Sequence, residues 1–282
     1  MKIKISADST CDLPQSILEQ YNIGITPLYI VRDGVDLVDG VDITPEDIYN
    51  HVAAGGDICS TAAVSVADYI KFFEAQRQEY DAVVHFCISS EMSCCYQNAC
   101  IAAEEVEGIY PIDSRNLSSG IGQLVIEAAV LAQQGELDAA AIADAVNAKK
   151  AKLDVSFVLD TLAYLHKGGR CSAVAAFGAN VLGLKPCIEV HDGKMGVGKK
   201  YRGKLQKCML QYIRERLEGR DDIETDRIFL TDSRGLTDEE LDELEQEILR
   251  CQPFQQVLRS KSGCTISNHC GPRCMGILFF HK

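Results

Sequence analysis

Residues 82–97 read AVVHFCISSEMSCCYQ, an apolar run followed at once by small polar residues. The run predicts a buried strand, and the residues after it predict a tight turn into a helix. Three hydroxyls, those of Ser89, Ser90 and Ser93, fall on this turn. In open parallel α/β sheets, ligands bind beyond the carboxyl ends of the strands, where helix N–H groups and short hydroxyls hold an anion. The turn is the expected ligand site, although Ser89 or Ser90 is equally consistent with a helix cap.

Short apolar segments alternate with helical patterns along the whole chain, which is typical of βαβ units and a mostly parallel sheet. Strands are expected at residues 3–7, 25–31, 58–61, 82–88, 108–112, 155–159, 186–190, 194–197, 227–230, 254–258 and 275–280. Helices are expected from Pro14 to about residue 21, from Pro45, after Ser65, over 120–132, 137–150, 162–166, 174–182 and 205–217, and after Thr237, whose Glu240 completes a capping box. The pair Asp192-Gly193 predicts a hairpin turn.

The basic run Lys149-Lys150-Ala151-Lys152 is a plausible hinge. We therefore expect an α/β fold of two domains, residues 1–152 and 153–282. The first is expected to contain a mostly parallel, Rossmann-like sheet and the second a mixed sheet.

Composition limits the possible functions. With 46% hydrophobic and 24% charged residues, the chain is expected to fold as a soluble globular protein. A net charge of −13 argues against binding to nucleic acid or to an anionic membrane surface. No stretch approaches the roughly 18 apolar residues of a membrane-spanning helix, and the start of the chain lacks the apolar block of a signal peptide. We expect a cytoplasmic protein with no integral membrane segment.

The 13 cysteines are expected to be reduced and mostly buried, because an odd number without a secretion signal does not suggest a disulfide framework. Zinc binding by Cys264, His269, Cys270 and Cys274 is an alternative, but their spacing matches no standard pattern. The glycine-rich motifs for dinucleotides and nucleotide phosphates are absent, as are the H-E-x-x-H and G-x-S-x-G motifs. No metal and no cofactor are therefore expected.

Three apolar strands end in Asp-Ser, at residues 8–9, 113–114 and 232–233. Each pair alone is consistent with a helix cap, but their recurrence suggests a shared polar rim. The residues assigned to this rim are Ser9, Ser89, Ser90, Ser114, Asn268 and Arg273.

Seven motifs in order carry a resemblance that spans the chain. They are Asp8-Ser9 with Asp12-Leu13-Pro14, Ile88-Ser89-Ser90 with Met92-Ser93 and Tyr96-Gln97, Asp113-Ser114, Leu165 through Ser172 with Lys167-Gly168-Gly169-Arg170, Leu184-Lys185-Pro186, Arg202-Gly203-Lys204, and His269 with Gly271-Pro272. With these motifs the chain resembles the DegV family.

The resemblance implies a two-domain α/β protein that holds a long-chain fatty acid between and within its domains. It also implies a partner, because well-understood members present the fatty-acid carboxylate to a separate, ATP-dependent fatty-acid kinase subunit. Carried over by motif, Thr61 and Ser93 would bind the carboxylate, with Arg202 and His269 from the second domain near it and near the phosphoryl donor. The protein would then not be catalytic alone.

A buried tail would supply most of the affinity, since each buried methylene contributes about 0.8 kcal/mol and some 15 of them roughly 12 kcal/mol before ordering costs. An ordinary core role is the simpler explanation for each apolar candidate. The candidates for lining the tail are Ile88, Phe157, Leu162, Leu165, Phe177, Leu182 and Ile188.

Departures from the family pattern leave alternatives open. The chain has Ala62 where the family often has serine, Cys94 where it usually has glycine, and Arg273 where it has glycine. Arg273 could replace or reinforce Arg202 as the cation at the carboxylate. One alternative is a stand-alone hydrolase or acyltransferase that uses Ser93 or Cys94. Another is a protein that binds a different, small carboxylate.

Overall fold

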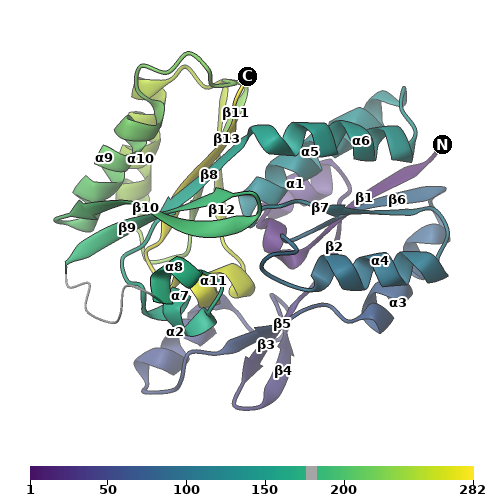
Figure 1. Cartoon of the computed structure of the whole chain (residues 1–282), viewed down its shortest axis with the longest axis horizontal. Helices are drawn as coiled ribbons and strands as arrows, with labels where there is room; N and C mark the ends of the chain where they lie inside the picture. Colours follow the sequence, from purple (N-terminus) through teal and green to yellow (C-terminus); the bar gives the residue numbers. More distant parts are fainter. Residues whose placement is uncertain (176–182) are drawn as a thin grey trace. The chain divides into compact units, whose positions relative to one another are not determined.

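The computed structural model describes residues 1–175 and 183–282 (Figure 1). Two of the expected tail-lining residues, Phe177 and Leu182, and most of the expected helix over 174–182 lie outside the described residues. By their internal contacts, Met1–Thr44, Cys59–Ala151 and Asp192–Lys194 form unit 1, and Pro45–Ile58, Lys152–His191 and Met195–Lys282 form unit 2. The chain passes from unit 1 to unit 2 after Ala151, within the run expected to be a hinge. Two further segments interrupt the division: residues 45–58 belong to unit 2 but are flanked by unit 1, and residues 192–194 belong to unit 1 but are flanked by unit 2.

Unit 1 contains a four-stranded parallel sheet in the order β2-β1-β6-β7. Its strands are β1 (Ile3–Asp8), β2 (Gly24–Thr26), β6 (Ala82–Cys87) and β7 (Ile109–Asp113). All three pairings are parallel, so the strands end at one edge of the sheet. Every residue of β6 is buried, as expected for a central strand covered on both faces. The predicted parallel sheet is confirmed.

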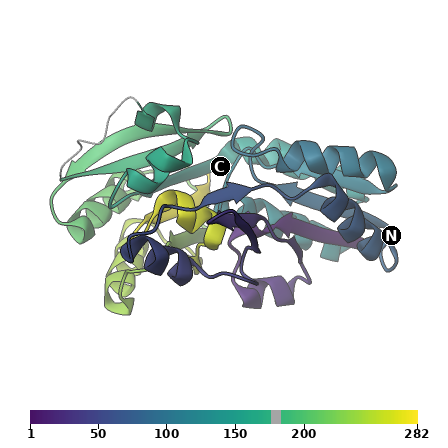
Figure 2. The ribbon, with the colours of Figure 1, turned by 90° about the horizontal axis from the view of Figure 1, so that it is seen from below.

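Helices cover both faces of this sheet (Figure 1). α3 (Val66–Arg77) and α4 (Cys95–Glu105) pack on one face, and α5 (Ser119–Gln134) and α6 (Ala139–Lys149) on the other. Both views show α5 and α6 side by side (Figures 1 and 2). The turn η1 (Ser9–Cys11) and the short α1 (Gln15–Gln20) connect β1 to β2.

A small antiparallel sheet, in the order β4-β3-β5, completes unit 1. Its strands are β3 (Tyr29–Arg32), β4 (Val35–Val38) and β5 (Ser60–Ala62). The prediction of one strand over 25–31 is therefore wrong, because residues 24–26 and 29–32 belong to different sheets. Pro27 separates them, and proline cannot donate the backbone hydrogen bond that a continuous ladder needs.

Unit 2 contains a six-stranded mixed sheet in the order β10-β9-β8-β13-β11-β12, which confirms the expected architecture. The strands are β8 (Leu153–Val158), β9 (Leu184–His191), β10 (Lys194–Arg202), β11 (Arg227–Asp232), β12 (Gln256–Lys261) and β13 (Met275–Phe280), and the turn η2 (Lys150–Lys152) precedes β8. Helices α9 (Leu205–Leu217) and α10 (Asp238–Cys251) pack together and share a core with the sheet. Helices α2 (Pro45–Ala53), α7 (Ala163–Gly168) and α11 (Cys264–Cys270) contact one another, and α8 (Ser172–Ala175) follows α7.

Two local predictions are confirmed. Thr237 Oγ1 accepts the backbone N–H of Glu240 at 3.2 Å, and Glu240 Oε2 accepts that of Thr237 at 2.9 Å, so the capping box of α10 is complete. Asp192 and Gly193 have φ of 49° and 80°, as a hairpin turn of type I′ requires. Among the described residues, no helix is both long and apolar enough to span a bilayer.

Candidate functional site

The turn after β6 holds Ser89 and Ser90, and both hydroxyls have partners within unit 1. Ser89 is fully buried; its Oγ donates to the carbonyl of Gly193 at 2.7 Å, and its N–H donates to that of Asn116 at 2.9 Å. Ser90 Oγ donates to Asp113 Oδ2 at 2.6 Å, and its N–H donates to Oδ1 at 3.1 Å. These two serines therefore hold the turn against Gly193 and the end of β7 and do not cap α4.

Ser93, the third hydroxyl of the turn, stands two residues before α4 and is half-buried. Its Oγ accepts the N–H of Cys95 at 3.3 Å and lies 3.2 Å from Cys95 Sγ, to which it donates. A thiol sulfur is a weak acceptor, so the Ser93 hydroxyl loses little if it turns to a stronger one. Among the three hydroxyls, Ser93 is the best placed to bind an anionic group.

Thr61 lies in β5 opposite Ile30 of β3 and is half-buried. The residues that follow it are tied to α4, because Asn98 Nδ2 donates to the carbonyl of Val64 at 2.8 Å. This bond brings the end of β5 and the first turn of α4 into the same part of unit 1. Thr61 and Ser93 therefore belong to neighbouring segments of one unit.

Asp8 ends β1 next to this turn and is fully buried. Its carboxylate accepts the N–H of Ile88 at 2.8 Å and that of Thr10 at 3.1 Å. Burial raises the pKa of Asp8 to about 6, against the opposing effect of these hydrogen bonds. Burial also raises the pKa of the Cys95 thiol to about 12, so this thiol stays protonated at neutral pH and is a poor nucleophile.

The alternative of nucleophilic catalysis by Ser93 or Cys94 needs a base in contact with the nucleophile. Among the described residues, Ser93 has its side-chain contact with Cys95, and the exposed Cys94 Sγ has one with Asn98 Nδ2 at 3.8 Å. Neither an amide nor a protonated thiol acts as a general base. These contacts do not favour a stand-alone hydrolase or acyltransferase.

The strand-end serines Ser9 and Ser114 fix turns. Ser9 Oγ donates to Asp39 Oδ2 at 3.0 Å and accepts the N–H of Leu28 at 3.1 Å. Ser114 Oγ donates to the carbonyl of Asn116 at 3.2 Å. Their geometry matches the turn or cap interpretation of the Asp-Ser pairs, and their place in a ligand-binding rim stays a prediction.

Arg115 is a cation beside the Ser90 turn that the sequence patterns did not indicate. Its Nη1 lies 3.3 Å from Glu91 Oε1 and 3.4 Å from Ser90 Oγ, and its guanidinium also donates to the carbonyl of Asp192. Its φ of 54° is in the left-handed region, which is uncommon for a residue other than glycine. The available signal was its place directly after Asp113 and Ser114 at a strand end.

His269 lies in the last turn of α11 in unit 2 and packs against Gly168, the last residue of α7. A methyl group at Gly168 would overlap Nδ1 of His269, so the two helices approach closely only because residue 168 is glycine. Arg170 Nη1 donates to the carbonyl of Gly168 at 2.7 Å. Burial, together with the positive charge of Arg170, lowers the pKa of His269 to about 4. His269 is therefore neutral at pH 7 and can act there as a hydrogen-bonding group but not as a cation.

The remaining polar candidates of unit 2 differ in exposure. Arg202 is exposed at the end of β10, and Asn268 is buried within α11. Arg273 Nη1 donates to the carbonyl of Gly235 at 2.6 Å and its Nη2 to Glu240 Oε1 at 2.8 Å. The guanidinium therefore holds the start of α10, and a role of Arg273 at a carboxylate stays a prediction.

Three of the apolar candidates for lining the tail lie in unit 2. Phe157 of β8 pairs with Ile188 of β9, and both are buried, as is Leu165 of α7. Their strand neighbours Val158 and Cys187 belong to the core shared with α9 and α10. Because successive side chains of a strand point to opposite faces, Phe157 and Ile188 face away from that core.

The other two described candidates for lining the tail, Ile88 and Leu162, lie in different units and differ in burial. Ile88 is buried in unit 1 at the end of β6, and Leu162 is half-buried before α7. No contact with a tail follows from burial alone, so the lining role of all these residues stays a prediction.

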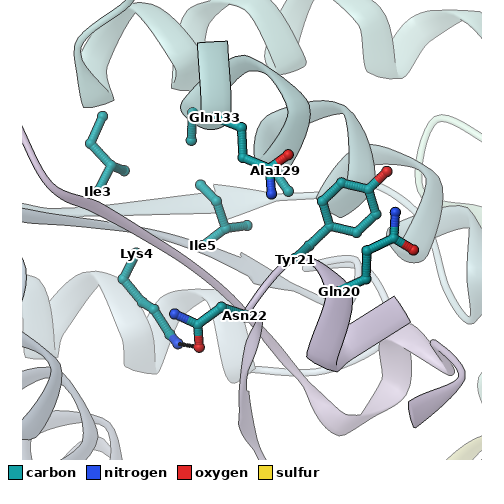
Figure 3. Close-up of a pocket in the computed structure, with 9 residues that line it drawn as sticks. Ile3, Lys4, Ile5, Gln20, Tyr21, Asn22, Ala129 and Gln133 are labelled. Atoms are coloured by element: carbon teal, nitrogen blue, oxygen red, sulfur yellow. Dashed lines mark hydrogen bonds between the residues drawn. The ribbon is translucent and has the colours of Figure 1, made fainter. Parts of the chain in front are cut away.

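A pocket of about 200 Å³ lies in unit 1 beside the first residues of β1, at the end of the parallel sheet away from the Ser89 turn (Figure 3). It is lined by Ile3, Lys4, Ile5, Gln20, Tyr21, Asn22, Ala129, Ala132 and Gln133. Lys4 Nζ donates to Asn22 Oδ1 at 2.9 Å at its edge. The volume is below the roughly 300 Å³ of small ligand sites, and none of the predicted site residues lines it.

Within the described residues, no group of three or more His, Cys, Asp or Glu side chains is arranged to hold a metal ion. The zinc alternative at Cys264, His269, Cys270 and Cys274 therefore gains no support.

The protein belongs to the class of two-unit α/β proteins, with a Rossmann-like parallel sheet in one unit and a mixed sheet in the other. Polar side chains stand at the ends of their strands. The model of the uncharacterised DegV protein family matches residues 2–282, so the chain belongs to the DegV family. DegV domain-containing proteins of Caldanaerobacter subterraneus subsp. tengcongensis and Clostridium perfringens are 32% and 30% identical to it, each over 100% of this chain and 99% of the relative.

Solved structures show the same similarity. A DegV family protein of Thermus thermophilus described as binding fatty acid has a TM-score of 0.88 and 28% identity over 100% of both chains. A stearic acid-binding protein of Eubacterium ventriosum has a TM-score of 0.84 and 27% identity, covering 99% of this chain and 98% of its own.

Proposed function

We propose that the protein binds a long-chain fatty acid, with the carboxylate held by Thr61 and Ser93. Two structural neighbours that bind fatty acids support this proposal, because their similarity covers the whole chain. The observation that carries the assignment of Ser93 is its hydroxyl, whose side-chain acceptor is a thiol that a carboxylate would readily replace. His269 and Arg202 are proposed to serve the same head group or the phosphoryl donor.

The first experiment is mass spectrometry of an organic extract of the purified protein. A fatty acid that buries about 15 methylenes of its tail would be bound tightly enough to survive purification. We expect a fatty acid in a molar amount close to that of the protein. A preparation that is empty and also fails to bind added palmitate or oleate would contradict the proposal.

The head-group assignment is tested by removing one hydroxyl at a time. Thr61→Val and Ser93→Ala should each weaken fatty-acid binding about 10- to 100-fold, because a hydrogen bond to a charged group contributes about 1.5 to 3 kcal/mol. Ser16→Ala, which removes an exposed hydroxyl on α1, is the matched control and should leave binding unchanged. Equal affinity of all three variants would show that other groups hold the carboxylate.

We further propose that the bound carboxylate is presented to a separate kinase subunit, which phosphorylates it with ATP. Arg202 is exposed and so could reach the phosphoryl group of a docked partner. Arg202→Ala should leave fatty-acid binding intact but reduce acyl-phosphate formation by a supplied kinase. Lys204→Ala, also an exposed cation, should change neither. Equal loss of both activities in Arg202→Ala would show a role in binding instead.

A further inference from the structure

Within the described residues, the side chain of Ser93 makes both of its hydrogen bonds with one residue, Cys95. Ser93 Oγ accepts the backbone N–H of Cys95 at 3.3 Å and donates to Cys95 Sγ at 3.2 Å. The backbone N–H of Ser93 donates to the carbonyl of Ser89 at 3.1 Å, which fixes the residue in the turn. The orientation of the Ser93 hydroxyl is therefore set by Cys95.

Cys95 is the first residue of α4, and its side chain is fully buried. Because burial raises the pKa of this thiol to about 12, the sulfur keeps its hydrogen at neutral pH. A protonated thiol is both a weak acceptor and a weak donor of hydrogen bonds. Cys95 can therefore accept the O–H of Ser93 before a ligand binds, and can donate its S–H to Ser93 Oγ once that O–H has turned to a ligand.

The hydrogen-bonding capacity of a serine hydroxyl is one hydrogen to donate and two lone pairs to accept. With a ligand bound, the backbone N–H and the S–H of Cys95 would fill both lone pairs of Ser93 Oγ. Only the O–H of Ser93 would then face the ligand. Such a hydroxyl donates to a carboxylate oxygen, in a bond that the negative charge strengthens, but cannot accept a hydrogen from an alcohol.

We propose that Cys95 is a positioning residue that acts through Ser93 and sets the specificity of the site for a carboxylate over an alcohol. This inference rests on the proposed binding of a fatty acid by Ser93. Cys95 itself is buried behind the hydroxyl and need not touch the ligand. Its sulfur keeps Ser93 a hydrogen-bond donor and so determines which head group the site accepts.

The test compares two ligands that share a tail and differ in head group, dodecanoate and dodecan-1-ol, by isothermal titration calorimetry. Cys95→Ala removes the sulfur and keeps the backbone N–H. It should weaken binding of dodecanoate about 3- to 10-fold, the effect of one ordinary hydrogen bond, and should not weaken binding of dodecan-1-ol. The ratio of the two affinities therefore falls by at least the same factor.

Two further substitutions at residue 95 separate the hydrogen bond from the packing. Cys95→Ser, whose hydroxyl both donates and accepts, should keep the wild-type ratio of affinities. Cys95→Val, which refills the volume without a hydrogen-bonding group, should lower the ratio as Cys95→Ala does. It takes the place of Cys95→Ala if that variant does not fold.

The matched control is Cys208→Ala, which removes another buried thiol, on α9 of unit 2. It should leave the ratio unchanged. In a Ser93→Ala background, Cys95→Ala should no longer change the ratio, because the hydroxyl through which it acts is gone.

Two results would overturn this inference and leave fatty-acid binding in place. One is equal weakening of both ligands by Cys95→Ala, which would show a packing role. The other is a change in the ratio that persists in the Ser93→Ala background. A wild-type protein that binds neither compound would instead overturn the proposed function, and this inference with it.

Discussion

Asp8 places an ionisable group in a fully buried position at the strand end beside the candidate site. Burial raises its pKa from 3.8 to about 6. Between about pH 4 and pH 6 the folded protein therefore holds a proton that the unfolded chain has lost, and the free energy of unfolding falls as the pH rises through this window. Two pKa units correspond to about 3 kcal/mol.

We predict that Asp8→Asn, which does not titrate, gains about 3 kcal/mol of stability relative to wild type between pH 4 and pH 7. Burial lowers the pKa of His85 to about 3, which makes the free energy of unfolding rise with pH and opposes the effect of Asp8. Because His85 is present in both proteins, its effect cancels in the difference between their free energies of unfolding. Urea denaturation at several pH values measures it. Asp57→Asn, at an exposed position, should leave the slope unchanged, and a constant difference between Asp8→Asn and wild type would refute the prediction.

Residue types at strand ends were predictable from the sequence, but their individual roles were not. Ser89, Ser90 and Ser93 were expected on one turn, and they lie there. Which hydroxyl is engaged depends on Asp113 and Gly193, which are distant in sequence and meet the turn only in the fold. Local patterns carry no information on such contacts.

At the scale of elements, the packing of α7 against α11 depends on one glycine. A methyl group at Gly168 would overlap Nδ1 of His269, and both residues are half-buried. We predict that Gly168→Ala lowers the free energy of unfolding by about 1 to 3 kcal/mol through overpacking and shifts the His269 ring resonances. Thermal denaturation and NMR of the histidine ring protons measure the two effects.

Gly196→Ala is the matched control for this prediction, because a methyl group there would meet no other atom within 4 Å. It should leave both stability and the His269 resonances close to wild type. Unchanged resonances in Gly168→Ala would show that the helices separate without moving His269.

Elements with strong periodic or capping signals were predicted correctly, as the capping box at Thr237 shows. Helix α11 was missed because its seven residues contain three that favour caps or turns, and a helix this short has little periodicity to detect. The division of residues 25–31 into β2 and β3 was missed although Pro27 indicates it, because the apolar residues on both sides of the proline predict a single strand when hydrophobicity alone is considered.

At the scale of the whole molecule, the family model that matches residues 2–282 establishes the family, and the fold of a solved DegV structure agrees over the full length. The class of ligand can be distinguished by how its affinity depends on the length of its tail. Burial of a fatty-acid tail contributes about 0.8 kcal/mol per methylene, which is about a fourfold change in affinity. A protein that recognises only a small carboxylate has no such dependence.

We therefore predict that affinity rises about fourfold with each added methylene along a series of saturated fatty acids from octanoate upward, until the chain exceeds the binding site. The rise in thermal denaturation temperature at a fixed ligand concentration reports the same trend, because a ligand that binds only the folded state stabilises it in proportion to the logarithm of its affinity. Methyl esters of the same chains, which lack the charged head group, separate the two contributions. The expected pattern is the same steep slope for acids and esters, with every ester binding more weakly than its acid by a constant factor. The tail contribution is shared, whereas the hydroxyls of Thr61 and Ser93 act on the carboxylate alone. Affinity independent of chain length would instead favour a small-carboxylate protein and end the fatty-acid proposal.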